Sequence, residues 1–100
     1  MASDLSFAEY VCAQCGDGVT VRRIFDDYGV CYRGKLIGMV CNNRFYVLIT
    51  YAGNDLLFDT FGKAKKAIPF EGAGAYLEIE CLDRPDILHK LIIKTYCELT

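Results

Sequence analysis

The segment from residue 19 to residue 51 most restricts the fold, because short apolar runs alternate there with residues that favour tight turns. The apolar runs cover residues 19–25, 30–32, 35–41 and 44–51. Asn42 and Asn43 separate the last two runs, and both residues tolerate the positive φ that a two-residue hairpin turn requires. We therefore expect an antiparallel meander of three strands, or of four strands if the segment from residue 19 also pairs.

Helical periodicity flanks this meander on both sides. Before it, apolar residues recur at helical spacing between residues 7 and 15, until the sequence Gly-Asp-Gly at residues 16–18 ends the run. After it, we expect a second helix that Asn54 caps and Pro69 ends. A third helix is predicted to open near Pro85, since proline is favoured in the first helical turn.

Residues 75–82 alternate between polar and apolar side chains, as a half-buried strand does, and a short additional strand is predicted near residues 67–70. The resulting order, α-β-β-β-α-β-α, predicts a two-layer α+β sandwich. A length of 100 residues and a hydrophobic content of 53% suffice for one domain over residues 1–100 with a single core. They also argue against intrinsic disorder.

Charge and cysteine content narrow the class of protein. A formal net charge of −2 argues against direct nucleic-acid binding, which would call for a basic protein. The longest uncharged apolar run, residues 45–52, is too short to span a membrane, and no signal peptide is recognisable. The six cysteines lie within apolar segments, where cysteine behaves as a small hydrophobic residue. We therefore expect reduced thiols in a cytoplasmic protein.

Three features have the residue types of metal or catalytic sites, and each has a simpler structural interpretation. Cys12 and Cys15 have the spacing of a metal-binding or redox pair, but His89 is the only histidine and no second Cys-x-x-Cys motif exists. We therefore place both cysteines in the core and His89 on a solvent-facing helix surface. Glu78 and Glu80 share one face of a strand, which suits a bound cation but is explained more simply by the solvated face of an edge strand.

Basic residues and tyrosines interleave in the meander, as in proteins that bind single-stranded nucleic acid. The residues concerned are Arg22, Arg23, Arg33, Lys35 and Arg44, with Tyr28, Tyr32 and Tyr46 nearby. The balancing acidic residues favour a solvated sheet edge instead, and Asp26 and Asp27 are interpreted as turn residues. Since no phosphate-binding loop or catalytic constellation is recognisable, we expect no enzymatic activity, no cofactor and no metal.

The stretch from residue 22 to residue 47 resembles the N-terminal domain of TfoX, in the TfoX/Sxy family of competence regulators. The family pattern is roughly R-x-M-F-G-G-Y-G-[IL]-[FY], then a turn containing glycine, an apolar strand, a two-residue turn and [LF]-Y-L-K. The residues that match in order and spacing are Arg23, Phe25, Tyr28, Gly29, Gly34, Tyr46 and the turn at Asn42 and Asn43. The helix before this stretch and the strand and helix after it lie where the family has them, so the resemblance covers nearly the whole chain.

The chain also departs from the family pattern, as a divergent member would. Asp26 and Asp27 stand where the family has paired glycines, Ile24 stands for its methionine, and Leu48 lies where many members carry a basic residue. Aspartate adopts the turn conformations of glycine less readily, so this turn is expected to be remodelled.

The resemblance implies an α-β3-α-β2-α fold in two layers, with a mainly antiparallel sheet and helices on one face, similar to type III secretion chaperones. It also implies a bacterial role in the transcriptional regulation of competence and DNA uptake. In the full-length regulators a second, helical domain follows, and they act as co-activators with the cyclic-AMP receptor protein.

We therefore predict a non-enzymatic protein-interaction module in transcriptional regulation, with the transcription machinery among its candidate partners. Segments 36–41 and 45–50 are apolar on both faces, and an uncovered apolar face would need a partner chain, either another protein or a second copy in a homodimer. The predicted interaction residues are Arg23, Phe25, Tyr28, Gly29, Gly34, Phe45, Tyr46 and Leu48. The alternative hypothesis is a small-molecule-binding or metal-binding domain that uses its thiols or acidic pairs.

Overall fold

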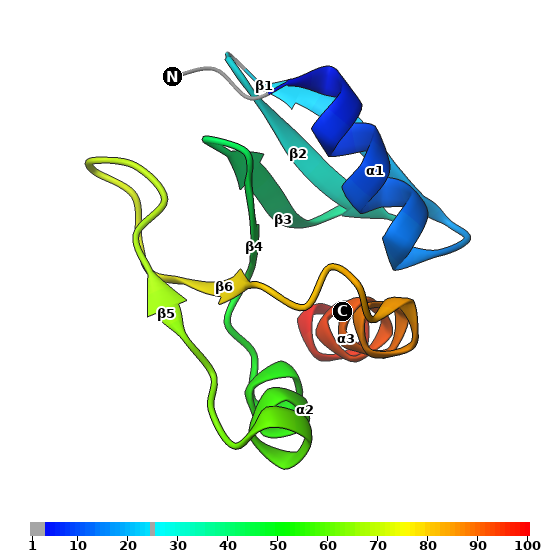
Figure 1. The fold of residues 1–100 in the computed structure, drawn as a ribbon, viewed down its shortest axis with the longest axis vertical. Coiled ribbons are helices and arrows are strands. Elements are labelled where there is room, and N and C mark those ends of the chain that lie inside the picture. Colours follow the sequence, from blue (N-terminus) through cyan, green and yellow to red (C-terminus); the bar gives the residue numbers. More distant parts are fainter. Residues whose placement is uncertain (1–3, 25) are drawn as a thin grey trace.

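The computed structural model describes residues 4–24 and 26–100, and within them three helices and six strands follow one another along the chain (Figure 1). In chain order these elements are α1 (Leu5–Cys15), β1 (Val19–Ile24), β2 (Asp27–Tyr32), β3 (Lys35–Cys41), β4 (Arg44–Val47), α2 (Tyr51–Phe61), β5 (Lys66–Ala67), β6 (Tyr76–Ile79) and α3 (Pro85–Leu99). None of the helices in these described ranges is long and apolar enough to cross a membrane.

The strands form one antiparallel sheet in the order β1-β2-β3-β4-β6-β5. The α+β class and the antiparallel meander are thus confirmed. β1 pairs with β2 along its whole length, so four strands rather than three precede α2. The observed order is therefore α-β4-α-β2-α instead of the expected α-β3-α-β2-α. The short additional strand predicted near residues 67–70 is present at Lys66–Ala67, so it begins one residue earlier and is shorter than expected.

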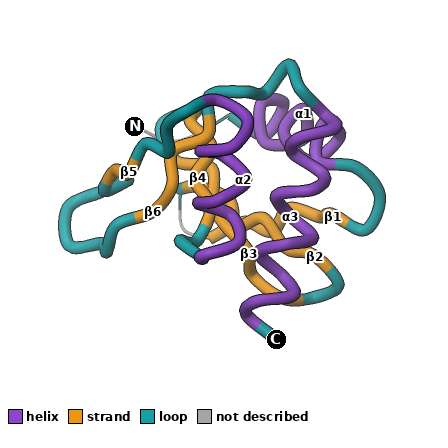
Figure 2. Tube along the Cα trace, turned by 90° about the horizontal axis from the view of Figure 1, so that it is seen from below, coloured by secondary structure: helices purple, strands orange, loops and turns teal. Residues whose placement is uncertain are grey.

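The core forms where strands and helices pack together in one cluster of buried residues, and Figure 2 shows α2 and α3 beside the strands. Residues at alternate strand positions point into it, so Phe45 and Val47 of β4 and Leu77 of β6 are fully buried. The fully buried helix residues that belong to the same cluster are Ala8, Val11, Cys15, Leu88, Leu91 and Ile92. α1 and α2 both pack against α3, which makes α3 the central helix of its layer.

Two hairpin turns set the register of the central strands. Asn42 and Asn43 join β3 to β4 with φ angles of 53° and 56°, as the sequence predicts. Arg33 and Gly34 join β2 to β3 with φ angles of 51° and 81°. Both turns have positive φ at two successive residues, which matches the twist of the strands that they connect.

A close approach between β3 and β4 requires glycine at position 38. A Cβ atom on Gly38 would overlap with the carbonyl oxygen of Tyr46 and would lie 3.0 Å from the Cα atom of Val47. Both atoms belong to the backbone of the facing strand, and Gly38 is paired with Val47 in the sheet. They therefore cannot move aside unless the two strands separate.

We expect Gly38→Ala to lower the free energy of unfolding by about 3 kcal/mol or more, because the added methyl group forces the two backbones apart. Gly74→Ala is the matched control, since a Cβ atom at Gly74 meets nothing within 4 Å. Urea unfolding followed by circular dichroism measures both changes. Equal stability of the two variants would contradict the close approach.

The bounds of α2 differ from those expected. The helix begins at Tyr51, so Asn54 lies within it and does not cap it. The helix ends at Phe61, where Gly62 adopts a left-handed conformation with a φ of 77°, well before Pro69. A glycine in this conformation commonly follows the end of a helix. The helix therefore stops at Gly62 and does not extend to Pro69, as the sequence analysis expected.

Two side chains cap the start of α2. The hydroxyl of Thr50 accepts a hydrogen bond of 3.0 Å from the amide of Gly53, which is the usual contact of an N-cap residue. The carboxylate of Glu98, which belongs to α3, accepts hydrogen bonds of 2.9 Å each from the amides of Tyr51 and Ala52. An anion is favoured at this end of a helix, so Glu98 both satisfies free amides and ties α2 to α3.

Two buried threonines differ in whether their hydroxyl groups are satisfied. Thr50 and Thr95 are both almost completely buried. The Thr50 hydroxyl caps α2, whereas the Thr95 hydroxyl has no hydrogen-bond partner among the residues that the structure describes. A buried polar group without a partner has lost its contacts with water and gained none in return.

We expect Thr95→Val to raise the free energy of unfolding by about 1 kcal/mol, because valine keeps the shape of the side chain and removes the unpaired hydroxyl. Thr50→Val should lower it by about 1 kcal/mol, because the N-cap hydrogen bond is lost. Urea titration of both variants at one pH provides the measurement. If both substitutions changed the free energy of unfolding in the same direction, the two hydroxyl groups would have equivalent environments. That result would contradict the assignment of a hydrogen bond to Thr50 alone.

Candidate interaction surface

Several of the predicted interaction residues lie inside the fold. Phe45 is fully buried, Tyr28 and Tyr46 are buried, and Leu48 is half-buried. Phe25 lies outside the described residues. The Phe45 ring therefore packs the core and does not present a surface to a partner in this fold.

The other motif residues shape the sheet. The guanidinium of Arg23 lies 5.7 Å from the centre of the Tyr28 ring, within the range of a cation–π contact. Gly29 lies within β2 rather than in the turn before it. A Cβ atom on Gly29 would come within 2.7 Å of Ile24 Cδ1 and 2.9 Å of Leu36 Cδ1, so glycine lets these two side chains approach over β2. Gly34 supplies a hairpin turn. The motif thus builds the sheet, and its residues do not converge on one site.

The tyrosines interleaved with basic residues do not form a platform for stacking bases. Tyr28, Tyr32 and Tyr46 are all buried, whereas single-strand binding uses exposed rings. Arg33 lies 5.4 Å above the Tyr32 ring, on the edge of the fold. Arg44 lies 4.0 Å from Glu78, so its charge is directed to a neighbouring strand.

Cys12 and Cys15 have different surroundings. The Cys12 thiol donates a hydrogen bond of 2.8 Å to the carbonyl oxygen of Val19, and Cys15 is fully buried in the core. Burial raises the pKa of Cys15 to about 12. All six cysteines are free. Among the described residues no group of three or more His, Cys, Asp or Glu side chains is arranged to hold a metal ion.

Cys41, the last residue of strand β3, is buried as well. Its thiol lies 3.4 Å from Oδ2 of Asp27, to which it donates a hydrogen bond. Burial, with a further contribution from this hydrogen bond, raises the pKa of Cys41 to about 11. Because the thiolate is the reactive form, both Cys15 and Cys41 are protonated and unreactive near neutral pH.

We expect a thiol reagent at about pH 8 to label Cys97 fastest, because Cys97 is exposed while the pKa values of Cys15 and Cys41 lie far above that pH. Absorbance after addition of a disulfide reagent follows the reaction. Cys97→Ser should remove the fast phase, and the wild type should release six thiols in denaturant. Fast modification of Cys15 in the folded protein would contradict its burial.

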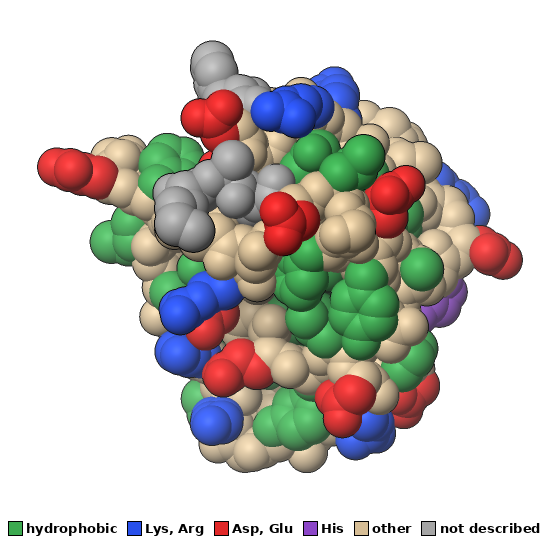
Figure 3. Space-filling model, turned by 45° about the horizontal axis from the view of Figure 1, so that its top comes forward, with side chains coloured by type: hydrophobic (Ala, Val, Ile, Leu, Met, Phe, Trp, Pro, Cys, Tyr) green, Lys and Arg blue, Asp and Glu red, His purple; other side chains and the backbone are tan. Residues whose placement is uncertain are grey.

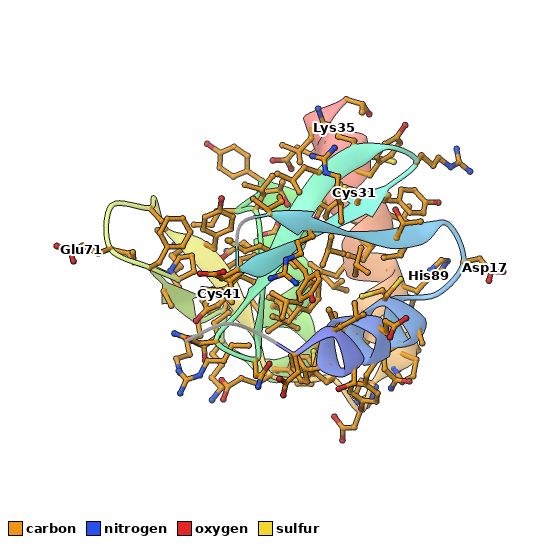
Figure 4. The ribbon with its side chains drawn as sticks, turned by 90° about the horizontal axis from the view of Figure 1, so that it is seen from above. Asp17, Cys31, Lys35, Cys41, Glu71 and His89 are labelled. Carbon is orange, nitrogen blue, oxygen red and sulfur yellow. The ribbon has the colours of Figure 1, made fainter. Side chains whose placement is uncertain are left out.

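His89 is half-buried, so its assignment to a solvent-facing surface is wrong. Its Nδ1 atom lies 2.9 Å from the carbonyl oxygen of Cys15, the last residue of α1. Figure 4 shows His89 beside the loop that carries Asp17, which follows that helix. The imidazole therefore links α3 to a backbone carbonyl at the end of α1.

Glu78 lies in a strand that is paired on both sides, so the interpretation of β6 as a solvated edge strand is wrong. The carboxylate of Glu78 lies 3.0 Å from Lys65 Nζ and 4.0 Å from Arg44 Nη1, and only 9% of the side chain is exposed. Two cations thus neutralise Glu78. Glu80 is exposed one position beyond the strand, and the two carboxylates do not make a cation site.

A groove of about 380 Å³ lies between the end of α2 and β6. Phe61, Leu57 and Ile79 provide its apolar surface. Its charged residues balance one another, namely Lys63, Lys65, Arg84, Glu78, Glu80 and Asp83. The groove therefore shows no excess of one charge that would select a charged ligand.

Four exposed apolar side chains lie in or directly before α2. Tyr51 is 87% exposed, Phe58 is 51% exposed, and Ile49 and Phe61 are each 40% exposed. Tyr51, Asp55 and Phe58 follow the i, i+4, i+7 spacing of one helical stripe. Only Gly53 and Leu57 are buried in this helix. We call Tyr51, Asp55, Phe58, Asp59 and Phe61 the α2 face.

The sequence analysis missed the α2 face, since it predicted this helix without identifying Phe58 or Phe61 as surface residues. A signal was present, because Asp55 and Asp59 lie about half a turn from Leu57 and so mark the outer side of the helix. Other exposed apolar side chains lie on other elements, and the face in Figure 3 shows several apolar side chains among charged ones. Among the described residues they are Leu5 and Tyr10 of α1, Leu36 of β3, and Ile68 and Phe70 between β5 and β6.

Comparison with known proteins gives no family assignment. No family model matches the chain. The chain is 33% identical over 78 residues to an uncharacterized 12.7 kDa protein in the trpE 5′ region of Spirochaeta aurantia. The aligned part is 76% of this chain and 64% of that protein, so the chain spans less than two thirds of this relative.

Proposed function

We propose that this domain is a non-enzymatic protein-interaction module and that the α2 face is its binding surface. The observation that carries the proposal is the exposure of Tyr51, Phe58 and Phe61 on one helix. Aromatic side chains are enriched at the centres of protein interfaces, where they contribute a large share of the binding energy. Contiguous apolar side chains on a surface are typical of such interfaces.

The contacts beneath α2 support this role because they hold the helix in place. Thr50 and Glu98 cap its first turn, and Leu57 anchors its inner side in the core. Gly53 allows close packing, since a Cβ atom there would come within 3.1 Å of Leu91 Cδ1 on α3. A rigid helix loses little conformational entropy when a partner binds, which favours recognition.

The resemblance to TfoX N-terminal domains supplies the biological part of the proposal. It favours partners in the bacterial transcription machinery, and it favours the two-layer sandwich shared with type III secretion chaperones. The observed fold belongs to the α+β class with an antiparallel sheet, as the resemblance implies, and this supports the proposal. The fourth strand before α2 departs from the order of the family. The motif residues then maintain the sheet, while the α2 face makes the contact.

No observation favours the alternative, a small-molecule-binding or metal-binding domain. The thiols of Cys12 and Cys41 donate hydrogen bonds to protein oxygens, and Cys15 is buried. Of the acidic pairs, Glu78 is occupied by Lys65 and Arg44. Ligand binding through Cys12, Cys41 or Glu78 would first have to break these contacts.

Affinity purification from bacterial cells tests the proposal with a matched pair of variants. We expect Phe58→Ser to reduce recovery of the partner at least about tenfold, because it removes an exposed aromatic contact without opening the core. Leu36→Ser is the control, because Leu36 is 38% exposed on β3, in a different element. Quantitative mass spectrometry compares the captured proteins, and thermal melts confirm that both variants fold.

Proteins that are captured equally by the wild type and by Phe58→Ser would contradict the proposal. Light scattering after gel filtration shows whether the partner is a second copy of the chain. A dimer that Phe58→Ser dissociates would identify the α2 face as a homodimer interface and would retain the proposal. A dimer that both variants preserve would place the interface elsewhere and would overturn it.

A further inference from the structure

We infer that the segment that docks on the α2 face is apolar and positively charged, with lysine or arginine beside its hydrophobic residues. This partner chemistry depends on the proposed function, since it describes the same surface. α2 contains Asp55 and Asp59 and no lysine or arginine. Both aspartates are exposed, and within the described residues neither takes part in an ion pair.

The two aspartates are unfavourable for the helix itself. Asp55 and Asp59 are four residues apart, so they lie next to each other on the helix surface and repel. Asp59 also lies in the last turn of α2, where the helix dipole disfavours a negative charge. Helix stability therefore gives no reason for this arrangement. A cation brought by a partner would remove the repulsion, so the charges fit a binding role.

The charges of α2 differ from those of the segment that follows it. Asp55 and Asp59 are the only charged residues of α2, whereas Lys63, Lys65 and Lys66 follow the helix. The negative charge is therefore confined to the helix itself. There it favours a cationic segment over an acidic one.

The spacing of the aromatic residues defines the shape of the segment. Tyr51 and Phe58 are seven residues apart, which places their Cα atoms about 10 Å apart along the helix axis. Asp55 lies between them on the same stripe. A matching segment presents two apolar side chains about two helical turns apart with a cation between them, as an amphipathic helix does. Lysine or arginine also interacts favourably with the exposed faces of the aromatic rings.

Peptide binding measured by fluorescence anisotropy tests this chemistry directly. The probes are a labelled amphipathic peptide of leucine and lysine and its counterpart of leucine and glutamate. We expect the lysine peptide to bind the wild type with a Kd below about 1 mM at low salt and the glutamate peptide to bind more weakly. The double variant Asp55→Asn, Asp59→Asn should bind the lysine peptide about threefold to tenfold more weakly, with a smaller salt dependence.

Control variants separate specific docking from general attraction to an acidic protein. Phe58→Ser should weaken binding of the lysine peptide, and Leu36→Ser should leave it unchanged. The inference is overturned by equal or tighter binding of the glutamate peptide, by no binding of the lysine peptide, or by an unchanged Kd in the double aspartate variant. Competition by a single-stranded oligonucleotide at the same site would also overturn it.

The same double variant in the cellular capture experiment separates this inference from the proposed function. A partner that depends on Phe58 but is captured equally by Asp55→Asn, Asp59→Asn would disprove the charge chemistry and leave the interaction module intact. A captured partner that depends on neither position would disprove both. Loss of the partner in both variants, with Leu36→Ser unaffected, is the expected result.

Discussion

The close approach of β3 and β4 at Gly38 is the constraint on which the rest of the structure depends. Any Cβ atom at this position would overlap with backbone atoms of the facing strand. This contact joins the β1-β2-β3 meander to the β4-β6-β5 part of the sheet, so both parts share one apolar face. Burial of that face then requires the helices, and α3 supplies the central contacts through Leu88, Leu91 and Ile92.

The position of α2 follows from this arrangement. It lies beside α3 with little more than Gly53 and Leu57 buried, so most of its side chains face outward. Such a helix would be only marginally stable by itself. Its start is instead fixed by Thr50 and by the Glu98 carboxylate from α3. The fold thus holds in place a helix whose outer side is aromatic and acidic, which is the basis of the proposed interaction.

Local sequence signals predicted the parts of the fold that depend on backbone conformation. Asn42 and Asn43 form the predicted turn because both residues accept a positive φ. The pairing of β1 and the interior position of β6 depend on contacts between distant segments, which periodicity does not report. The start of α2 was missed for the same reason, because part of its cap comes from Glu98.

The candidate site was less predictable than the fold. Apolar residues at helical spacing predict a buried stripe, but α2 has room for only part of its apolar residues against α3, so Phe58 and Phe61 remain exposed. His89 lies near the end of α1 because α3 packs against α1, which brings the imidazole to the carbonyl oxygen of Cys15. Periodicity does not report this contact between distant segments. Conversely, the motif from residue 22 to residue 47 was predicted to mark the interaction residues, and in the structure Tyr28, Phe45 and Tyr46 are buried.

The central claim is that a partner contacts the outer side of α2, and site-specific photo-crosslinking in living cells tests it most directly. A photoreactive phenylalanine analogue replaces Phe58 in one strain and Leu36 in another. The account predicts a covalent adduct with one defined protein from position 58 and none from position 36. Adducts from position 36 alone, or from neither position while the domain is folded and abundant, would contradict it.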